Sequence, residues 1–171
     1  MPFGLGFHPY FHTPLGPMGT AESCEIAIDV TERWDQASIS SPANVSSISE
    51  EEWPRKSLAL SDLPATTQSS EGLARNHKFV RRAPPDGDIG LRATLTDNTN
   101  GIAAVLEASA EMSTLVFYTP PTAPVVSFEP HTCIPNGFNL KAAGIPDPGV
   151  LVLEPGQIWE AWYQIRTELL H

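Results

Sequence analysis

The sequence predicts a mainly β protein, folded as an antiparallel β-sandwich or as part of one. The 17 prolines and 12 glycines are spread along the whole chain, a punctuation too dense for long helices. Several segments alternate apolar and polar residues with a period of two, and turn residues separate them at regular intervals. With 171 residues, 41% of them apolar, the chain is long enough for one domain, residues 1–171, with a substantial core.

The first clear strand covers residues 25–30, where Ile26, Ile28 and Val30 are expected to share one face. Residues 89–95 alternate in the same way, with Arg92 outside. The residues of this second strand that we expect inside are Ile89, Leu91, Ala93 and Leu95.

A β-hairpin is expected over residues 89–108. The segment 97–101 reads Asp-Asn-Thr-Asn-Gly, which is a turn in both residue type and position. The alternation resumes at Ile102 and continues to Ala108, so the two alternating segments should pair through this turn.

Four further strands follow along the chain, and proline stands at the end of the first three, where its missing N–H does no harm. They are expected at residues 114–119, 125–129, 149–153 and 159–166. The last of them should place one set of residues on a single face, namely Trp159, Ala161, Tyr163 and Ile165. Residues 35–72, rich in Ser, Thr, Ala and Pro, are predicted as a long excursion over the β scaffold.

Charge and composition exclude several classes of protein. The net charge is −10, from 20 acidic and 10 basic residues, which argues against nucleic-acid binding because that function needs a basic surface. No apolar stretch approaches the ~20 residues of a membrane span. The first residues have no basic region, and Gly, Pro and His interrupt their apolar run, so we expect no signal peptide and a cytoplasmic location.

Two residues have a setting that suits proton transfer. His8 stands among Phe7, Pro9 and Tyr10, and histidine is the usual proton-transfer group near neutral pH. Glu129 ends an apolar strand, and an unpaired carboxylate there would favour proton uptake, as a general base does. The plainer alternatives stay open at this point: a structural histidine in a loop, and a glutamate at a sheet edge that reaches solvent.

Other kinds of chemistry find less support. His77 and His131 could join Glu129 around a metal ion, but their spacing matches no metal signature, and no metal or cofactor is assigned. The four tryptophans could stack on sugar rings or fill the core, and Trp159 fits the core by its periodicity. The sequence contains no GxSxG motif, no phosphate-binding P-loop and no GxGxxG motif.

Four segments together resemble the aldose 1-epimerase, or galactose mutarotase-like, family. Residues 6–11 read GFHPYF, and residues 126–139 read VSFEPHTCIPNGFN. Residues 117–120 (FYTP) and 152–157 (VLEPGQ) match two further short family segments. Each segment is short, but their order and spacing agree with the family over nearly the whole chain. The resemblance implies that the sandwich is part of a β-supersandwich.

The resemblance also implies roles for particular residues. His8 matches the family's general acid and Glu129 its general base. Asn76 takes the place of a substrate-contacting aspartate, and His77 and Tyr10 are further candidates for substrate binding. The expected activity is interconversion of the α and β anomers of an aldose by acid–base ring opening, with no cofactor.

Members of that family are considerably longer than this chain, and the resemblance is to their C-terminal half. We therefore expect a chain that is truncated at its N-terminus relative to the family, with sheet edges that a homodimer could cover. Expected ligands are a monosaccharide or a sugar phosphate. Two alternatives to catalysis stay open: a sugar-binding module without catalysis, and an inactive fragment of an epimerase.

Overall fold

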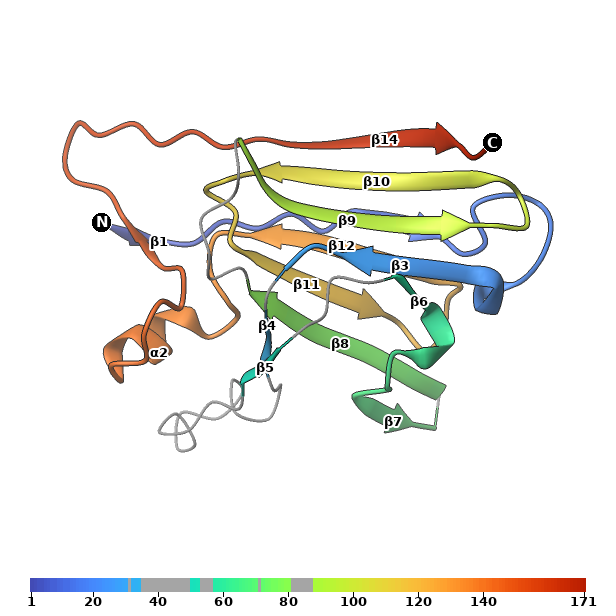
Figure 1. The fold of residues 1–171 in the computed structure, drawn as a ribbon. Helices are drawn as coiled ribbons and strands as arrows, with labels where there is room; N and C mark the ends of the chain where they lie inside the picture. The colour runs from blue at the N-terminus through green and yellow to red at the C-terminus, as the bar shows by residue number, and fades with distance from the viewer. Residues whose placement is uncertain (31, 35–49, 53–56, 71, 81–87) are drawn as a thin grey trace.

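The protein folds as two antiparallel β-sheets packed face to face (Figure 1). The computed structural model describes residues 1–30, 32–34, 50–52, 57–70, 72–80 and 88–171. The predicted class, a mainly β antiparallel sandwich, is confirmed. Among the described residues, no helix is long and apolar enough to cross a membrane.

The first sheet has five strands in the order β14-β10-β9-β3-β6. Their bounds are Cys24–Ile28 for β3, Ser57–Ala59 for β6, Ile89–Asp97 for β9, Ile102–Ser109 for β10 and Tyr163–Leu169 for β14. The hairpin expected over residues 89–108 is confirmed as β9 and β10, which pair antiparallel from Asp97 opposite Ile102.

The second sheet has seven strands, in the order β2-β12-β11-β8-β4-β5 with β7 paired to β8. Their bounds are Tyr10–His12 for β2, Glu32–Trp34 for β4, Glu50–Glu52 for β5, Thr67–Ser69 for β7, Gly72–Val80 for β8, Thr114–Thr119 for β11 and Val125–His131 for β12. A short pair, β1 (Pro2–Phe3) with β13 (Leu151–Val152), forms a separate two-stranded sheet.

In the described part of the chain the helices are short. They are the six-residue α-helix α2 (Gly137–Ala142) and the 3₁₀ turns η1 (Ala21–Ser23) and η3 (Leu60–Asp62). Helix α2 lies beside a small second core made by Trp34, Ile134 and Leu140.

One hydrophobic core fills the space between the two sheets. The five-stranded sheet contributes Ile26, Leu91, Leu95 and Leu106, and the seven-stranded sheet contributes Phe79, Leu115, Phe117, Val126 and Phe128. Every second residue of β11 and β12 therefore points inward. The intervening residues of these strands point to the outer face of the seven-stranded sheet, which is where the candidate site lies.

Several details of the expected strands need correction. Ile26, Ile28 and Val30 share one face and are buried, but Ile89, which was expected inside, is 41% exposed at the start of β9. The strand expected to stop at residue 129 continues to His131, because Pro130 still accepts a hydrogen bond through its carbonyl oxygen from Phe7 N. The strand expected at 149–153 is reduced to β13.

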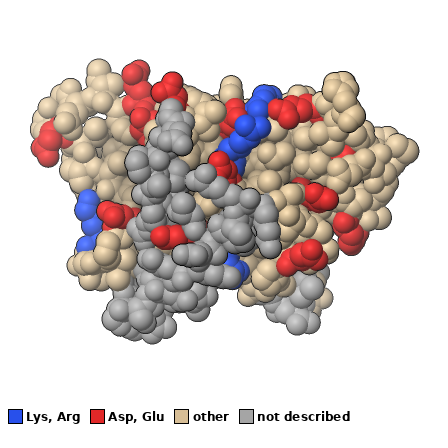
Figure 2. Space-filling view, viewed as in Figure 1, with Lys and Arg blue, Asp and Glu red and all other residues tan. Residues whose placement is uncertain are grey.

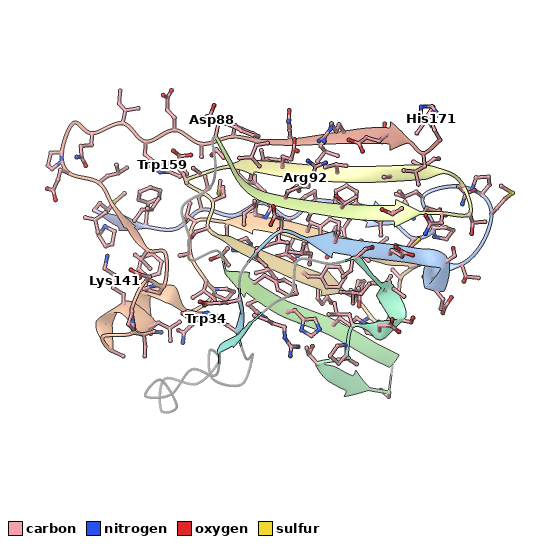
Figure 3. The ribbon with its side chains drawn as sticks, viewed as in Figure 1. Trp34, Asp88, Arg92, Lys141, Trp159 and His171 are labelled. Atoms are coloured by element: carbon pink, nitrogen blue, oxygen red, sulfur yellow. The ribbon has the colours of Figure 1, made fainter. Side chains whose placement is uncertain are left out.

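The last strand begins later than expected. Trp159 and Ala161 pack against the core, as the alternation predicted, but they precede β14, which starts at Tyr163. Tyr163 and Ile165, which the alternation places on the same face as Trp159 and Ala161, are exposed. Trp159 also lies beside the N-terminal strand β1, where its ring meets that of Phe3 edge-on with the ring centroids 5.3 Å apart (Figure 3).

Part of residues 35–72 belongs to the sheets rather than to a plain excursion, since β5, β6 and β7 lie in it; residues 35–49, 53–56 and 71 lie outside the described part of the chain. On the face toward the viewer, acidic side chains are widely spread, as the net charge of −10 predicts (Figure 2). Arg92 and Arg166 flank Glu107 on this outer surface, at 3.3 and 2.9 Å.

Candidate functional site

Polar side chains gather on the outer face of the seven-stranded sheet because three long strands pair there in register. Val116 of β11 lies opposite Lys78 of β8 on one side and opposite Glu129 of β12 on the other. Residues directly opposite each other in a sheet share a face. Lys78 and Glu129 therefore flank Val116 on one surface.

A second row of residues lies beside the first on the same face. Tyr118 of β11 is opposite both Asn76 of β8 and Ser127 of β12. Because side chains alternate along a strand, these three residues point to the same side as Lys78 and Glu129.

The N-terminal segment runs antiparallel along the other edge of β12 and supplies His8. Tyr10 pairs with Ser127, and Gly6 forms a bridge with His131. His8 lies midway between Tyr10 and Gly6, so this register places it opposite Glu129. Backbone hydrogen bonds from Phe7 N to Pro130 O (3.1 Å) and from Thr132 N to the Leu5 carbonyl (2.9 Å) hold the segment in place.

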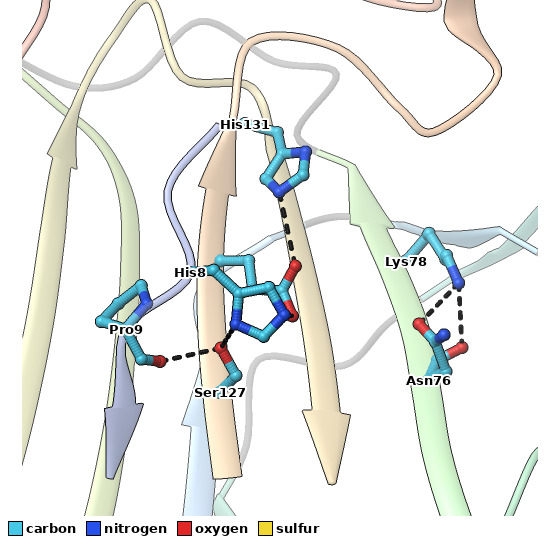
Figure 4. Close-up of polar contacts among 7 residues, drawn as sticks. His8, Pro9, Asn76, Lys78, Ser127 and His131 are labelled. Carbon is cyan, nitrogen blue, oxygen red and sulfur yellow. Dashed lines mark hydrogen bonds and ion pairs between the residues drawn. The ribbon is translucent and has the colours of Figure 1, made fainter. Parts of the chain in front are cut away.

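The two residues expected to carry catalysis are in direct contact. His8 Nε2 lies 2.9 Å from Glu129 Oε1, and His131 Nε2 lies 3.5 Å from the other oxygen, Oε2 (Figure 4). The Glu129 side chain is only 8% exposed, whereas that of His8 is 49% exposed. A buried carboxylate is stabilised when it is paired in this way. Its histidine partner can still be reached from solvent.

Ser127 lies beneath the His8 ring. Its hydroxyl donates a hydrogen bond to the Pro9 carbonyl oxygen at 2.8 Å, and its Oγ also lies 3.1 Å from His8 Nδ1. The residue is fully buried. Both nitrogens of the His8 ring therefore have a polar partner, one in Glu129 and the other in Ser127.

An open pocket of about 550 Å³ lies on this face of the sheet, beside His8 and Glu129. Its lining residues are His8, Asn76, Lys78, Val116, Tyr118, Glu129, His131 and Pro135. A pocket of this size, with polar groups that converge from several strands, suits a small polar ligand.

Lys78 and Asn76 form the side of the pocket on β8. Lys78 Nζ donates to Asn76 Oδ1 at 2.6 Å and to the Asn76 carbonyl at 3.4 Å (Figure 4). Burial lowers the pKa of Lys78 from 10.5 to about 8, and the charge of Glu129 partly opposes this shift. An amide and an ammonium side by side can donate to and accept from sugar hydroxyls.

Tyr10 and His77, the other two residues expected to bind substrate, do not line the pocket. Tyr10 is 53% exposed and packs beside His8, with ring centroids 4.7 Å apart, at the rim of the site. The pKa of Tyr10 is raised, first by burial and then by Tyr118 and Glu129.

The structure does not bring His77 to the pocket. It is opposite Phe117 in the sheet and so faces the core side, where its Nε2 lies 2.8 Å from the Pro64 carbonyl and its Nδ1 lies 3.2 Å from an Arg33 guanidinium nitrogen. Burial lowers its pKa from 6.5 to about 4. In the described part of the chain, no group of three or more His, Cys, Asp and Glu side chains is arranged to hold a metal ion.

Sequence reasoning did not single out Ser127, Tyr118 and Lys78 as a group around one site. Their period-two positions on two predicted strands were a usable signal for Ser127 and Tyr118. Strand β8 gave no such signal because Arg75, Asn76, His77 and Lys78 are consecutive polar residues, and a period of two cannot be read from them.

Known proteins resemble this chain in family and in fold. The family model for aldose 1-epimerase matches residues 1–166. Among solved structures, the Slr1438 protein of Synechocystis sp. PCC 6803 is similar at 20% identity with a TM-score of 0.65, covering 99% of this chain and 46% of that one. A galactose mutarotase-like protein from Clostridium acetobutylicum is similar at 20% identity with a TM-score of 0.61, covering 99% and 48%.

A galactose mutarotase related enzyme from Lactobacillus acidophilus is similar at 17% identity with a TM-score of 0.59, covering 100% of this chain and 52% of that one. These likenesses concern the fold, and the chain spans about half the length of each structure that it resembles. No curated protein matches the sequence. Since the family model covers nearly all of it, the chain belongs to the aldose 1-epimerase family.

Proposed function

We propose that this chain catalyses the interconversion of the α and β anomers of an aldose, with Glu129 as general base and His8 as general acid. The observation that carries the proposal is the contact between His8 Nε2 and Glu129 Oε1, at 2.9 Å, on the wall of an open pocket. Mutarotation needs one base and one acid at the anomeric centre, and these two atoms are close enough to serve the same sugar.

The proton transfers balance over the reaction. Glu129 takes the proton of the O1 hydroxyl while His8 gives a proton to the ring oxygen O5. The C1–O5 bond breaks with its electron pair going to O5, and a C1–O1 double bond forms. After rotation about C1–C2, O5 attacks the other face of C1 and returns its proton to His8, and O1 recovers a proton from Glu129. The two residues end as they began, without a cofactor.

The sugar enters by separating the two residues. The direct contact between His8 and Glu129 is replaced by a contact of each residue with the substrate. The ring of His8 can move for this purpose, since its side chain is half exposed, whereas Glu129 is held in the buried strand. Asn76 and Lys78 face the pocket from β8 and would bind hydroxyl groups of the sugar.

The proposal is tested by polarimetry with freshly dissolved α-D-glucose and α-D-galactose. We expect faster equilibration with the protein than without it, and a loss of roughly 10²–10⁴-fold in kcat for Glu129→Gln. Glu111→Gln is the matched control, because Glu111 is exposed and lies away from this pocket. If the wild-type chain accelerates no aldose, catalysis by this chain is refuted.

A sugar phosphate is the second candidate ligand, because the ammonium of Lys78 could pair with an anion. D-glucose 6-phosphate in the same assay distinguishes it: a kcat/KM at least tenfold above that of D-glucose would identify a phosphorylated substrate. A sugar-binding module without catalysis is the alternative from another class. It would show binding of the sugar by calorimetry without faster mutarotation.

A further inference from the structure

The Ser127 hydroxyl touches two groups but has one hydrogen to give. The Pro9 carbonyl oxygen can only accept, so the hydroxyl hydrogen points to it across 2.8 Å. His8 Nδ1, 3.1 Å from the same Oγ, must then be the donor. The opposite arrangement, with the hydroxyl turned to Nδ1, would leave two oxygen lone pairs facing each other at 2.8 Å. Both contacts are satisfied only if Nδ1 carries a hydrogen.

The second ring nitrogen follows from the first. A neutral His8 with its hydrogen on Nδ1 would turn the lone pair of Nε2 toward Glu129 Oε1, 2.9 Å away. That contact is favourable only if a further proton lies between the two atoms. The proton belongs either to an imidazolium ring that faces a carboxylate or to a carboxylic acid that faces a neutral ring. In both cases His8 and Glu129 share one mobile proton.

We infer that Ser127 is a positioning residue for the acid–base pair: it keeps a hydrogen on His8 Nδ1 and so makes Nε2, which faces Glu129, the atom that carries the transferable proton. A third group that orients a histidine in this way recurs in acid–base sites. The kinetic consequence rests on the proposed function. The hydrogen on His8 Nδ1 does not depend on the proposed function, because it is a property of the protein without substrate.

Ser127 is suited to this role by its place in the fold. It is fully buried in the middle of β12, between Val126 and Phe128, which are both in the core. Its Oγ is therefore fixed, and the half-exposed ring of His8 adopts its orientation from it. The Ser127 hydroxyl hydrogen points to the carbonyl oxygen of Pro9, the residue next to His8. A lone pair of Ser127 Oγ is thereby left facing His8 Nδ1.

Other ionisable groups face this pair from four strands, namely β2, β8, β11 and β12. On β12, His131 contacts Glu129 Oε2 at 3.5 Å. The Tyr10 and Tyr118 rings lie 4.7 and 6.2 Å from the His8 ring. The charge of Lys78 on β8 interacts with Glu129. The polar contact of Nδ1 is with Ser127 Oγ rather than with any of these groups, so removal of the Ser127 hydroxyl tests that nitrogen selectively.

The test is an NMR titration of the ligand-free protein labelled with ¹⁵N in its histidine rings, with His8→Asn used to assign the His8 signals. In the wild type we expect a hydrogen on Nδ1 throughout the pH range in which the pair holds its shared proton. In Ser127→Ala we expect the proton affinity of the His8 ring to fall roughly tenfold, because a hydrogen bond to the charged ring is lost. Ser127→Thr, which keeps the hydroxyl, should restore it.

Ser113→Ala is the matched control. Ser113 also donates to a backbone carbonyl, that of Thr132 at 3.1 Å, but it does not touch His8. It should leave the His8 titration unchanged. If the wild-type ring carries no hydrogen on Nδ1, or if Ser127→Ala titrates like the wild type, the inference is overturned, and the wild-type spectrum decides this even if the variant does not fold.

Kinetics supply a second readout. Ser127→Ala should lower kcat roughly tenfold at a nearly unchanged KM and move the alkaline limb of the pH–rate profile to lower pH, because His8 loses its proton earlier. An unchanged alkaline limb would contradict the role. If the wild-type chain proves inactive, the proposed function fails, and the NMR result still stands or falls by itself.

Discussion

His77 and Lys78 are neighbours in β8, yet they face opposite sides of the seven-stranded sheet. His77 is opposite Phe117 and turns toward the core side, whereas Lys78 is opposite Val116 and lines the pocket. Both are almost fully buried, and burial lowers the pKa of each, that of His77 to about 4 and that of Lys78 to about 8. The two residues therefore make stability depend on pH in two separate ranges.

On the acid side, His77 should make the protein less stable. Its folded pKa of about 4 is below its ordinary value of 6.5, so the unfolded chain binds more protons between these values. The free energy of unfolding then falls as the pH falls from about 6.5 to about 4, by up to about 3 kcal/mol from this residue. The main physical reason is that burial disfavours the charged ring and lowers its pKa, and the positive charge of the nearby Arg33 adds to this effect.

The measurement is urea denaturation of wild type and His77→Gln at pH 7 and pH 4.5. Glutamine can still donate to the Pro64 carbonyl and accept from Arg33 without titrating, so the variant should lose less stability than the wild type. His12→Gln is the control, since His12 is exposed. Equal losses in wild type and His77→Gln would contradict the buried neutral state of His77.

On the alkaline side, Lys78 should make the protein more stable as the pH rises. Its pKa is about 8 in the folded protein and 10.5 in the unfolded chain, so the unfolded chain holds more protons in between and the free energy of unfolding rises with pH. We expect Lys78 to contribute a gain of roughly 1–2 kcal/mol between pH 8 and 9.5. Lys78→Met should remove that gain, and so should Asn76→Asp, because a carboxylate beside the ammonium keeps it charged.

Lys141→Met serves as the control for this prediction, because Lys141 lies on the exposed side of α2. Chemical denaturation at the two pH values gives the difference directly. A gain in Lys78→Met as large as in the wild type would show that other groups cause it.

Strand β8 also shows what the sequence could not predict. The β9–β10 hairpin was predictable because Leu91, Ala93 and Leu95 alternate with polar residues up to a turn rich in Asn, Thr and Gly. In β8 the inward positions Arg75 and His77 are polar too, since they reach the carbonyl oxygens of Leu63 and Pro64 at the sheet margin. Polar residues on both faces remove the period-two signal.

The site was predictable in part for a similar reason. The face of Glu129 followed from alternation along its strand, and the family resemblance pointed to His8 and Glu129. The contact of Glu129 with His8 depends on the register between β12 and the N-terminal segment, which is a long-range pairing that no local pattern encodes. The opposite orientation of His77 depends on register in the same way.

Removal of the His8 ring should affect activity far more than stability. His8→Asn deletes the Nε2 donor, so under the proposed function kcat should fall roughly 10²-fold or more. The His8 side chain is half exposed, and His131 remains beside the Glu129 carboxylate when His8 is replaced, so we expect a loss of stability of only about 1 kcal/mol. Polarimetry and thermal unfolding of the same preparation check both parts. A strongly destabilised variant would show that His8 has a structural role instead.

Gly6 and His131 should be coupled energetically, because the His131 ring lies where a side chain at position 6 would be. A Cβ added to Gly6 would come within 2.7–2.8 Å of three atoms of that ring. Gly6→Ala should therefore displace the ring from Glu129 and destabilise the protein by about 1–3 kcal/mol. In a His131→Ala background the obstacle is absent, so the same substitution should cost less than about 0.5 kcal/mol, which makes the coupling energy measurable by a double-mutant cycle.

Gly4→Ala is the matched control for this cycle. Its added Cβ would come within 2.6 Å of Cys133 Sγ rather than of His131, so its effect should be the same with and without the His131 side chain. Urea denaturation of the four Gly6 and His131 combinations gives the coupling energy. Additive effects of Gly6→Ala and His131→Ala would mean that the His131 ring is not held against the N-terminal segment, and the contact of His131 with Glu129 Oε2 would then not depend on Gly6.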